Sequence, residues 1–178
     1  MPDLLPAGPA LSRLFEEFEH TAWRLESQPS YEADERTETY AQWLRGESWP
    51  DESDDPWYAQ RRALIDTGRR IERVRLVSQP ATDGERYLLA RAPLTLAVGE
   101  DIRYLWRPNA ERLSLPRIDV WIFDSRFGAL FHYDGSRQLG IELIEDPARV
   151  LGFCQVRDAA WHHAIPHAEF TRAVPSTM

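Results

Sequence analysis

The residues best suited to chemistry lie between positions 119 and 146, where six carboxylates accompany one histidine. Carboxylates paired with a histidine can perform acid–base catalysis, and clustered carboxylates can bind Mg²⁺. The set comprises Asp119, Asp124, His132, Asp134, Glu142, Glu145 and Asp146. Asp124 and Asp134 stand where hairpin turns favour aspartate, and Asp146 stands where it would cap a helix. Asp119 and His132 have no such local explanation, so they are the candidate catalytic residues.

Asp119 alternates with Val120 along an expected strand and therefore faces the same side as Trp121. A charged residue beside an aromatic ring on one face of a sheet is typical of a pocket or an interface. Two arginines, Arg103 and Arg126, could hold a phosphate group beside these carboxylates. Trp121, Arg103 and Arg126 are therefore candidate binding residues.

A second candidate surface is an arginine cluster between positions 61 and 75, where six guanidinium groups could contact phosphates. Its members are Arg61, Arg62, Arg69, Arg70, Arg73 and Arg75. The first four are the candidate binding residues of this cluster. Asp66 and Glu72 interleave with the arginines, and an acidic segment precedes them at 16–55. A solvated or internally paired face is therefore the main alternative. The net charge of −8 also argues against direct nucleic-acid binding.

The common catalytic signatures are absent from the sequence. There is no G-x-S-x-G elbow and no G-x-G-x-x-G loop. All 21 basic residues are arginine, so a P-loop and the paired His-x-Lys motif of phospholipase-type nucleases are both excluded. Cys154 and His162 are separated by about 12 Å of helical rise, which favours a buried core thiol over a nucleophile. No motif fixes an enzyme mechanism.

A metal site at the C-terminal histidines is the weaker interpretation of their spacing. His163 and His167 are four residues apart, but Pro166 lies between them and disturbs the helix. No cysteine or carboxylate stands at a spacing typical of zinc sites. Histidines at a helix end complement exposed carbonyl groups instead. We therefore expect no metal and no cofactor.

The length of 178 residues indicates a single domain, with an ordered core at about 9–170 and short flexible tails. No apolar run approaches the roughly 18 residues needed to span a bilayer. One cysteine allows no intrachain disulfide. The first residues do not resemble a secretory signal. These features predict a cytoplasmic protein that does not enter a membrane.

The elements that must position these residues are strands joined by tight turns. Three consecutive strands are expected at 118–123, 127–133 and 138–144, and short turns between them predict an antiparallel meander. A further strand at 71–77 would extend it. The expected helices lie at 9–20, 37–44, 56–66, 82–91 and 146–165, the fourth broken by Pro93. The predicted fold is α+β, an antiparallel meander of three or more strands with helices packed on one face.

The order of several stretches is similar to that of a known family. These stretches are LFEEFEHTAWRLES, VRLVSQPATD, AVGEDIRYL, DVWIFD and DAAWHHAIPHAEF. They resemble an uncharacterised, streptomycete-type actinobacterial domain family of unknown function, over about 14–170. The arginine-only composition and the single asparagine, Asn109, fit a GC-rich genome. The segment at 80–101 departs from the family, because arginines and Gly84 replace a more apolar helix.

The resemblance implies a genomic neighbourhood rather than a chemical activity. Genes of this family often lie beside helix-turn-helix regulators and small partner proteins, in clusters resembling toxin–antitoxin loci. We therefore expect a noncatalytic regulatory protein that binds such a regulator, and a homo-oligomer is compatible with the sequence. One alternative is a nucleotide- or RNA-directed enzyme or toxin-like effector that uses an Asp/His/Arg site on the meander. A second alternative is a small-molecule sensor with a pocket between sheet and helices.

Overall fold

A seven-stranded mixed β-sheet forms the centre of the molecule. The computed structural model describes residues 3–48 and 50–174. The strand order across the sheet is β6-β5-β4-β1-β2-β3-β7. The strands are β1 (Thr21–Glu26), β2 (Arg70–Val77), β3 (Asp101–Trp106), β4 (Asp119–Phe123), β5 (Phe127–Asp134), β6 (Arg137–Ile144) and β7 (Ile165–Pro166). Strands β1, β2 and β3 run parallel, whereas the other neighbours pair antiparallel.

The prediction of a simple antiparallel meander with helices on one face is wrong. The meander β4–β5–β6 exists, but β2 pairs with β1 and β3 and does not extend it. Parallel neighbours need long crossovers, and the helical segments between β1, β2 and β3 supply them. All five residues of β4 are buried, which is typical of a strand covered on both faces. The fold is α+β overall, with helices on both faces of a mixed sheet.

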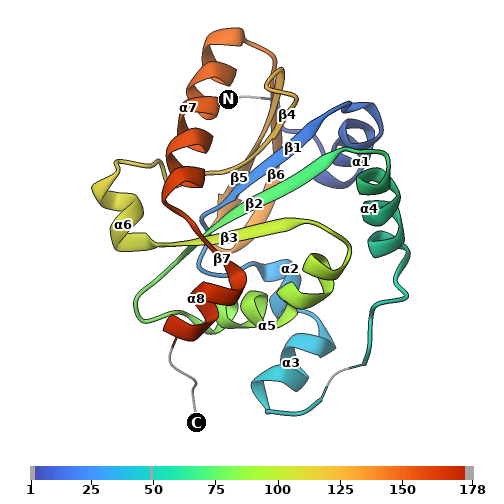
Figure 1. Cartoon of the computed structure of the whole chain (residues 1–178), viewed down its shortest axis with the longest axis vertical. Helices are drawn as coiled ribbons and strands as arrows, with labels where there is room; N and C mark the ends of the chain where they lie inside the picture. Colours follow the sequence, from blue (N-terminus) through green and yellow to red (C-terminus); the bar gives the residue numbers. More distant parts are fainter. Residues whose placement is uncertain (1–2, 49, 175–178) are drawn as a thin grey trace.

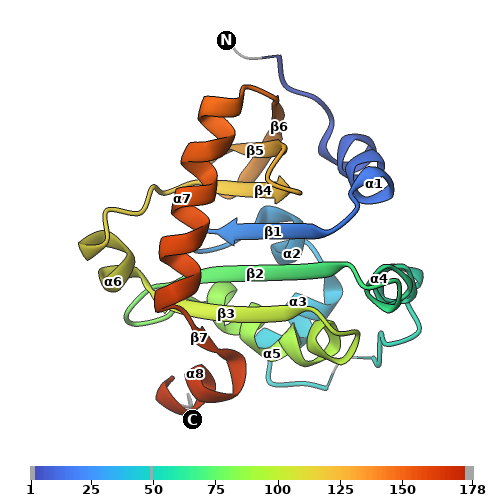
Figure 2. The same cartoon turned by 45° about the horizontal axis from the view of Figure 1, so that its top comes forward.

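One face of the sheet is covered by α6 (Arg107–Arg112) and α7 (Pro147–His163). Figure 2 shows α7 crossing the strands on this face. The expectation of a buried thiol is confirmed, because Cys154 of α7 packs in the same core as Trp23 and Ile122. The centre of this face is therefore an apolar interface.

The opposite face is covered by two groups of helices (Figure 1). Helices α1 (Ala7–Glu17) and α4 (Pro56–Asp66) lie over the amino-terminal half of the parallel strands. The other half is covered by α2 (Glu32–Glu35), α3 (Glu38–Leu44), α5 (Asp83–Ala97) and α8 (His167–Ala173). In the described part of the chain, no helix combines the length and apolar character needed to cross a membrane.

The local roles expected for three aspartates are confirmed. Asp124 adopts a positive φ of 51° in the β4–β5 turn, and its carboxylate accepts the backbone amides of Glu19, His20 and Thr21. Asp134 closes the β5–β6 hairpin with Arg137. Asp146 caps α7 by accepting the amide of Arg149 at 2.9 Å. These side chains serve the backbone.

Helix α5 passes through Pro93, so the expected break there is wrong. A capping box between Thr82 and Glu85 starts the helix, and Ala92 is buried in the core beside Pro93. Gly84 is required by close packing, because a Cβ there would lie 2.8 Å from the Pro29 carbonyl oxygen. This contact explains why glycine interrupts a segment expected to be more apolar.

We predict that Gly84→Ala destabilises the protein whereas Gly152→Ala stabilises it. Alanine in a helix gains about 0.5–1 kcal/mol over glycine, and a Cβ at Gly152 would meet no atom within 4 Å. At Gly84 the clash with the backbone costs about 1–3 kcal/mol. Urea denaturation measures both. Equal gains in the two variants would contradict the close approach of α5 to Pro29.

Candidate functional site

A cavity of about 750 Å³ lies between α1, α4 and the sheet. Its floor is formed by Arg24, Arg73 and Trp121. These residues belong to β1, β2 and β4, and Arg24 is the register partner of both others. Side chains at paired positions of neighbouring strands point to the same face, so the sheet register itself assembles the floor. Apolar side chains of α1 and α4, including Phe15 and Leu64, form the walls.

The two floor arginines are held by buried carboxylates. Arg73 donates from Nε to Glu100 Oε2 at 2.7 Å, and its Nη1 lies 3.3 Å from Glu26 Oε1. Arg24 contacts Glu26 at 3.3 Å and Asp119 at 3.6 Å. Burial opposes ionisation of Glu26, yet the neighbouring arginines hold its pKa well below the ordinary value. The carboxylates therefore stay charged and fix the orientation of the guanidinium groups.

Arg61 of α4 is less well paired than the two floor arginines. Its guanidinium lies 3.5 Å from the ring centroid of Phe15 and 4.7 Å from that of Trp57. Its nearest carboxylate is Glu100 at 3.8 Å, and only 11% of its side chain is exposed. Burial, together with the positive charge of Arg73, lowers the pKa of Arg61 to about 9. Arg61 is still protonated at neutral pH, at a cost in folding free energy.

Three arginines of the cavity have donors left over. Arg24 Nε, Arg61 Nη1 and Arg69 Nε are buried and have no hydrogen-bond partner among the described residues. A buried unpaired donor costs free energy, and native proteins rarely keep one without a reason. The three residues line the same cavity, although the three unpaired atoms themselves lie out of contact with solvent.

Asp119 lies on the same face as this cavity but is saturated with donors. It is 1% exposed and accepts from the Ser27 amide at 2.7 Å and from the Tyr31 hydroxyl at 2.6 Å. The Ser27 and Tyr133 hydroxyls also donate to it, at 3.1 and 3.5 Å. Its carboxylate therefore ties β4 to the segment after β1.

The structure does not bring His132 to Asp119. Asp119 pairs directly with Phe131, so His132 points to the opposite face of the sheet. There its Nε2 lies 3.1 Å from Glu142 Oε2, and Glu142 in turn contacts Arg149 of α7 at 2.6 Å. The two candidate catalytic residues thus belong to separate networks.

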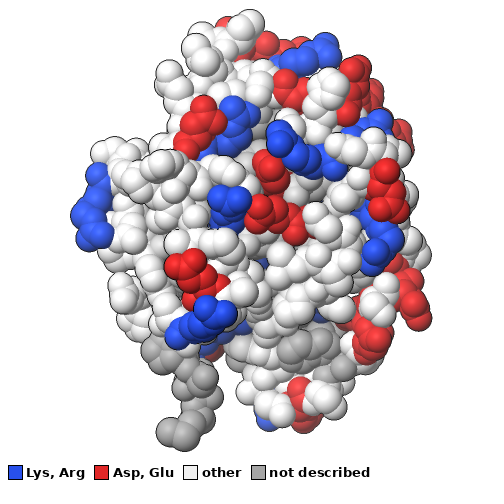
Figure 3. All heavy atoms as spheres, in the orientation of Figure 1, with Lys and Arg blue, Asp and Glu red and all other residues white. Residues whose placement is uncertain are grey.

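The arginine cluster seen in the sequence is dispersed, although Arg61, Arg69 and Trp121 all line the cavity. Arg62 is exposed and donates to the Ala97 carbonyl at 3.0 Å, whereas Arg70 has a side chain that is 70% exposed. The face drawn in Figure 3 carries acids and arginines interspersed, without a broad patch of one sign.

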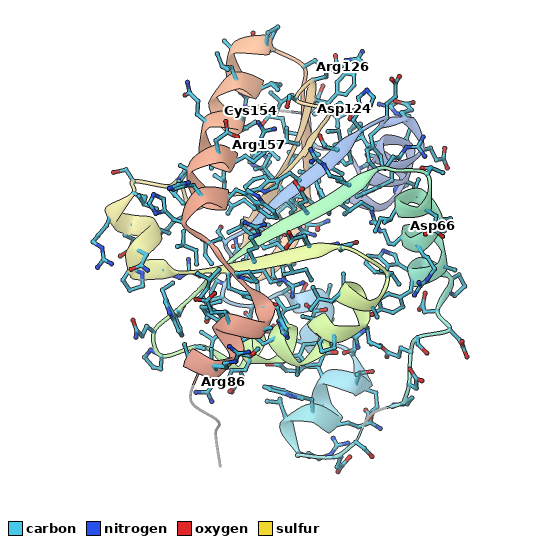
Figure 4. The ribbon with its side chains drawn as sticks, viewed as in Figure 1. Asp66, Arg86, Asp124, Arg126, Cys154 and Arg157 are labelled. Atoms are coloured by element: carbon cyan, nitrogen blue, oxygen red, sulfur yellow. The ribbon has the colours of Figure 1, made fainter. Side chains whose placement is uncertain are left out.

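The remaining candidates lie elsewhere. Arg103 stacks on Trp161 at 3.8 Å on the opposite face of the sheet. Arg126 lies in the β4–β5 turn near Asp124. Figure 4 shows both of them away from Asp66, which marks the end of α4. Among the residues that the structure describes, no group of three His, Cys, Asp or Glu side chains could hold a metal ion.

The sequence did not identify Arg24 or Trp57 as site residues, and it gave Arg73 only as a member of the arginine cluster. Arg24 and Arg73 alternate with apolar residues in their strands, a pattern that a solvated sheet face also produces. Trp57 is 37% exposed and lies beside Arg61. The sequence did contain one signal: two charged residues alternate in each of two strands, Arg24 and Glu26 in β1 and Arg73 and Arg75 in β2. Such a pattern is what a buried layer of ion pairs requires.

Comparisons with known proteins identify a family and a fold. The sequence matches the family described as domain of unknown function DUF6879 over residues 9–172. No curated protein matches the chain. The fold is similar to that of Nuc, a phospholipase D family member from Salmonella typhimurium, with a TM-score of 0.52 at 9% identity, over 93% of this chain and 98% of that one.

NucT from Helicobacter pylori matches over the same shares of the two chains, with a TM-score of 0.46 and 9% identity. At such identity the likeness to Nuc concerns the fold alone. The chain has no lysine and therefore no His-x-Lys pair.

We predict that Asp119→Asn destabilises the protein by about 3–5 kcal/mol, because it leaves the buried Arg24 short of a counterion. The matched control is Asp134→Asn, an exposed hairpin residue whose loss changes stability by less than about 0.5 kcal/mol. Urea denaturation of both variants gives the comparison, and soluble yield serves if Asp119→Asn does not fold. An unchanged midpoint for Asp119→Asn would contradict its structural role.

Proposed function

The chain belongs to the domain family of unknown function DUF6879, and we propose that it is a noncatalytic regulatory protein that binds a small anionic ligand. The binding site is the cavity between α1, α4 and the sheet. The observation that carries the proposal is the set of four arginines that line one cavity, Arg24, Arg61, Arg69 and Arg73, of which Arg61 lies 3.8 Å from its nearest carboxylate.

The site is preorganised for an anion. Glu100, Glu26 and Asp119 already orient the floor arginines, so binding costs little side-chain entropy there. Four buried or half-buried arginines face three buried carboxylates around Arg61, which leaves positive charge in excess. An anion would pair with that excess charge and relieve the cost of burying Arg61.

The ligand also has an apolar part. Leu11, Phe15, Trp57, Leu64 and Trp121 line the cavity beside the arginines. A volume of about 750 Å³ lies within the range typical of small-molecule sites and exceeds what an inorganic anion fills. The cavity therefore suits a molecule with one charged end and an apolar or aromatic body.

A catalytic function has less support. Asp119 is engaged by donors, and His132 lies on the other face of the sheet. The residues that line the cavity include no histidine, cysteine or aspartate, and its serine and glutamate, Ser12 and Glu16, are both exposed on α1. Binding therefore explains the site better than the Asp/His/Arg enzyme that the sequence also allowed.

To test the binding site, Arg61→Met is compared with Arg62→Met. A panel of small carboxylates, sulfates and phosphates is screened by thermal unfolding and by fluorescence of Trp57 and Trp121. At 100 times Kd, a ligand raises Tm by about 5–10 °C. We expect Arg61→Met to abolish this response and Arg62→Met to keep it.

The same variants give an independent readout without ligand. Arg61→Met removes a buried cation that is short of a counterion, so its unfolding free energy should be unchanged or higher than that of the wild type. Arg62→Met serves as the control for loss of an exposed arginine. Failure of every anion in the panel to stabilise the wild type, or an identical response in both variants, would refute the proposal.

We further propose that the protein acts in the cytoplasm of an actinobacterium as the partner of a helix-turn-helix regulator, in a locus of the toxin–antitoxin type. This part of the proposal rests on the family resemblance. The regulator encoded beside the gene should co-purify with the tagged protein, and a homo-oligomer would be detected by light scattering. A stable monomer that never associates with that regulator would argue against it.

A further inference from the structure

We infer that the anionic group bound in the cavity is a phosphate monoester on an apolar or aromatic body. This inference rests on the proposed ligand-binding function and names the chemical class of the ligand. It is carried by the number and origin of the arginines that line the cavity, by the charge balance and by the cavity walls.

The unpaired donors come from three different parts of the chain. Arg24 Nε belongs to β1, Arg61 Nη1 to α4, and Arg69 Nε to the connection between α4 and β2. A carboxylate offers two oxygens in one plane, whereas a phosphate monoester offers three terminal oxygens in a tetrahedral arrangement. Guanidinium groups that line one cavity from three separate elements match the tetrahedral group better.

The charge balance favours a dianion. Five buried or half-buried arginines surround the site, Arg24, Arg61, Arg69, Arg73 and Arg75. They face three buried carboxylates, Glu26, Glu100 and Asp119. Two positive charges are therefore left in excess, and the further carboxylate in the lining, Glu16, is exposed to solvent. A phosphate monoester carries about −1.5 to −2 at pH 7, which matches this excess, whereas a carboxylate carries only one negative charge.

The walls account for the rest of the ligand. Phe15 and Trp57 already contact the Arg61 guanidinium, so an aromatic ring entering beside them could stack on the same plane. The cavity is bounded by two helices and the sheet, and its volume of about 750 Å³ accommodates one or two rings beyond the phosphate. The class that fits is a small phosphorylated aromatic molecule, of the size of a mononucleotide.

The test uses two matched probes, phenyl phosphate and benzoate, with inorganic phosphate as a third. Isothermal titration at pH 7 measures their affinities for the full chain. We expect phenyl phosphate to bind at least about tenfold more tightly than benzoate, because it engages the additional charged donor. Phenyl phosphate should also bind more tightly than inorganic phosphate, because only the former contacts the apolar walls.

Two neighbouring arginines provide the matched variants. Arg69→Met removes a half-buried donor of the cavity and should weaken phenyl phosphate by about tenfold or more, with a smaller effect on benzoate. Arg70→Met removes the adjacent arginine, which is 70% exposed and does not line the cavity. It should leave both affinities unchanged.

The outcomes separate this inference from the proposed function. Equal affinities for phenyl phosphate and benzoate, both lost in Arg61→Met, would overturn the phosphate assignment and leave anion binding intact. Inorganic phosphate that binds as tightly as phenyl phosphate would overturn the aromatic body. Phenyl phosphate binding that survives both Arg61→Met and Arg69→Met would overturn the inference, because the probe would then bind elsewhere. Absence of binding for every probe and every anion of the panel would overturn both.

Discussion

The structure depends on a layer of ion pairs buried between the sheet and its helices. Arg24 and Glu26 of β1 meet Arg73 and Arg75 of β2 across paired positions, and Asp119 joins them from β4. Buried charges are tolerated only when they are paired, so these contacts fix which strands are neighbours and in which register. A slip of one residue would turn the charges into the apolar core under α7. The charged layer thus specifies the arrangement of the central strands.

The same layer decides where a ligand can bind. In open sheets with parallel strands, ligands usually lie beyond the carboxyl ends of the strands. Here that end is occupied, because Asp119 is bound by Ser27 and Tyr31, and Glu85 accepts from Arg107. The cavity near it, beside Glu26 and Glu85, has a volume of only about 10 Å³. The unpaired donors lie instead towards the amino-terminal half, where α1 and α4 leave a cavity of about 750 Å³.

Local chemistry was predictable from the sequence, whereas strand pairing was not. The turn and cap roles of Asp124, Asp134 and Asp146 depend on neighbours within a few residues, and so does the meander. The parallel pairing of β1 with β2 joins residues about fifty positions apart, and no local pattern states its direction. The arginines of β2 were also compatible with a solvated face, because polar alternation is the same whether water or buried carboxylates lie opposite. The cavity depends on that pairing. Arg61, Arg69 and Trp121 were therefore identified as candidates from the sequence, but not as residues of one cavity.

A fold similar to that of a phospholipase D family member does not bring that family's chemistry with it, because chemistry lies in side chains. This chain has no lysine, and its candidate Asp119 serves as a strand-end anchor. What distinguishes the site is its charge imbalance. A well-packed apolar residue at position 61 would cost less than a buried cation 3.8 Å from its nearest carboxylate. A cation kept in such a position destabilises the free protein, and binding an anion converts that cost into affinity. The imbalance is therefore better explained by ligand binding than by stability.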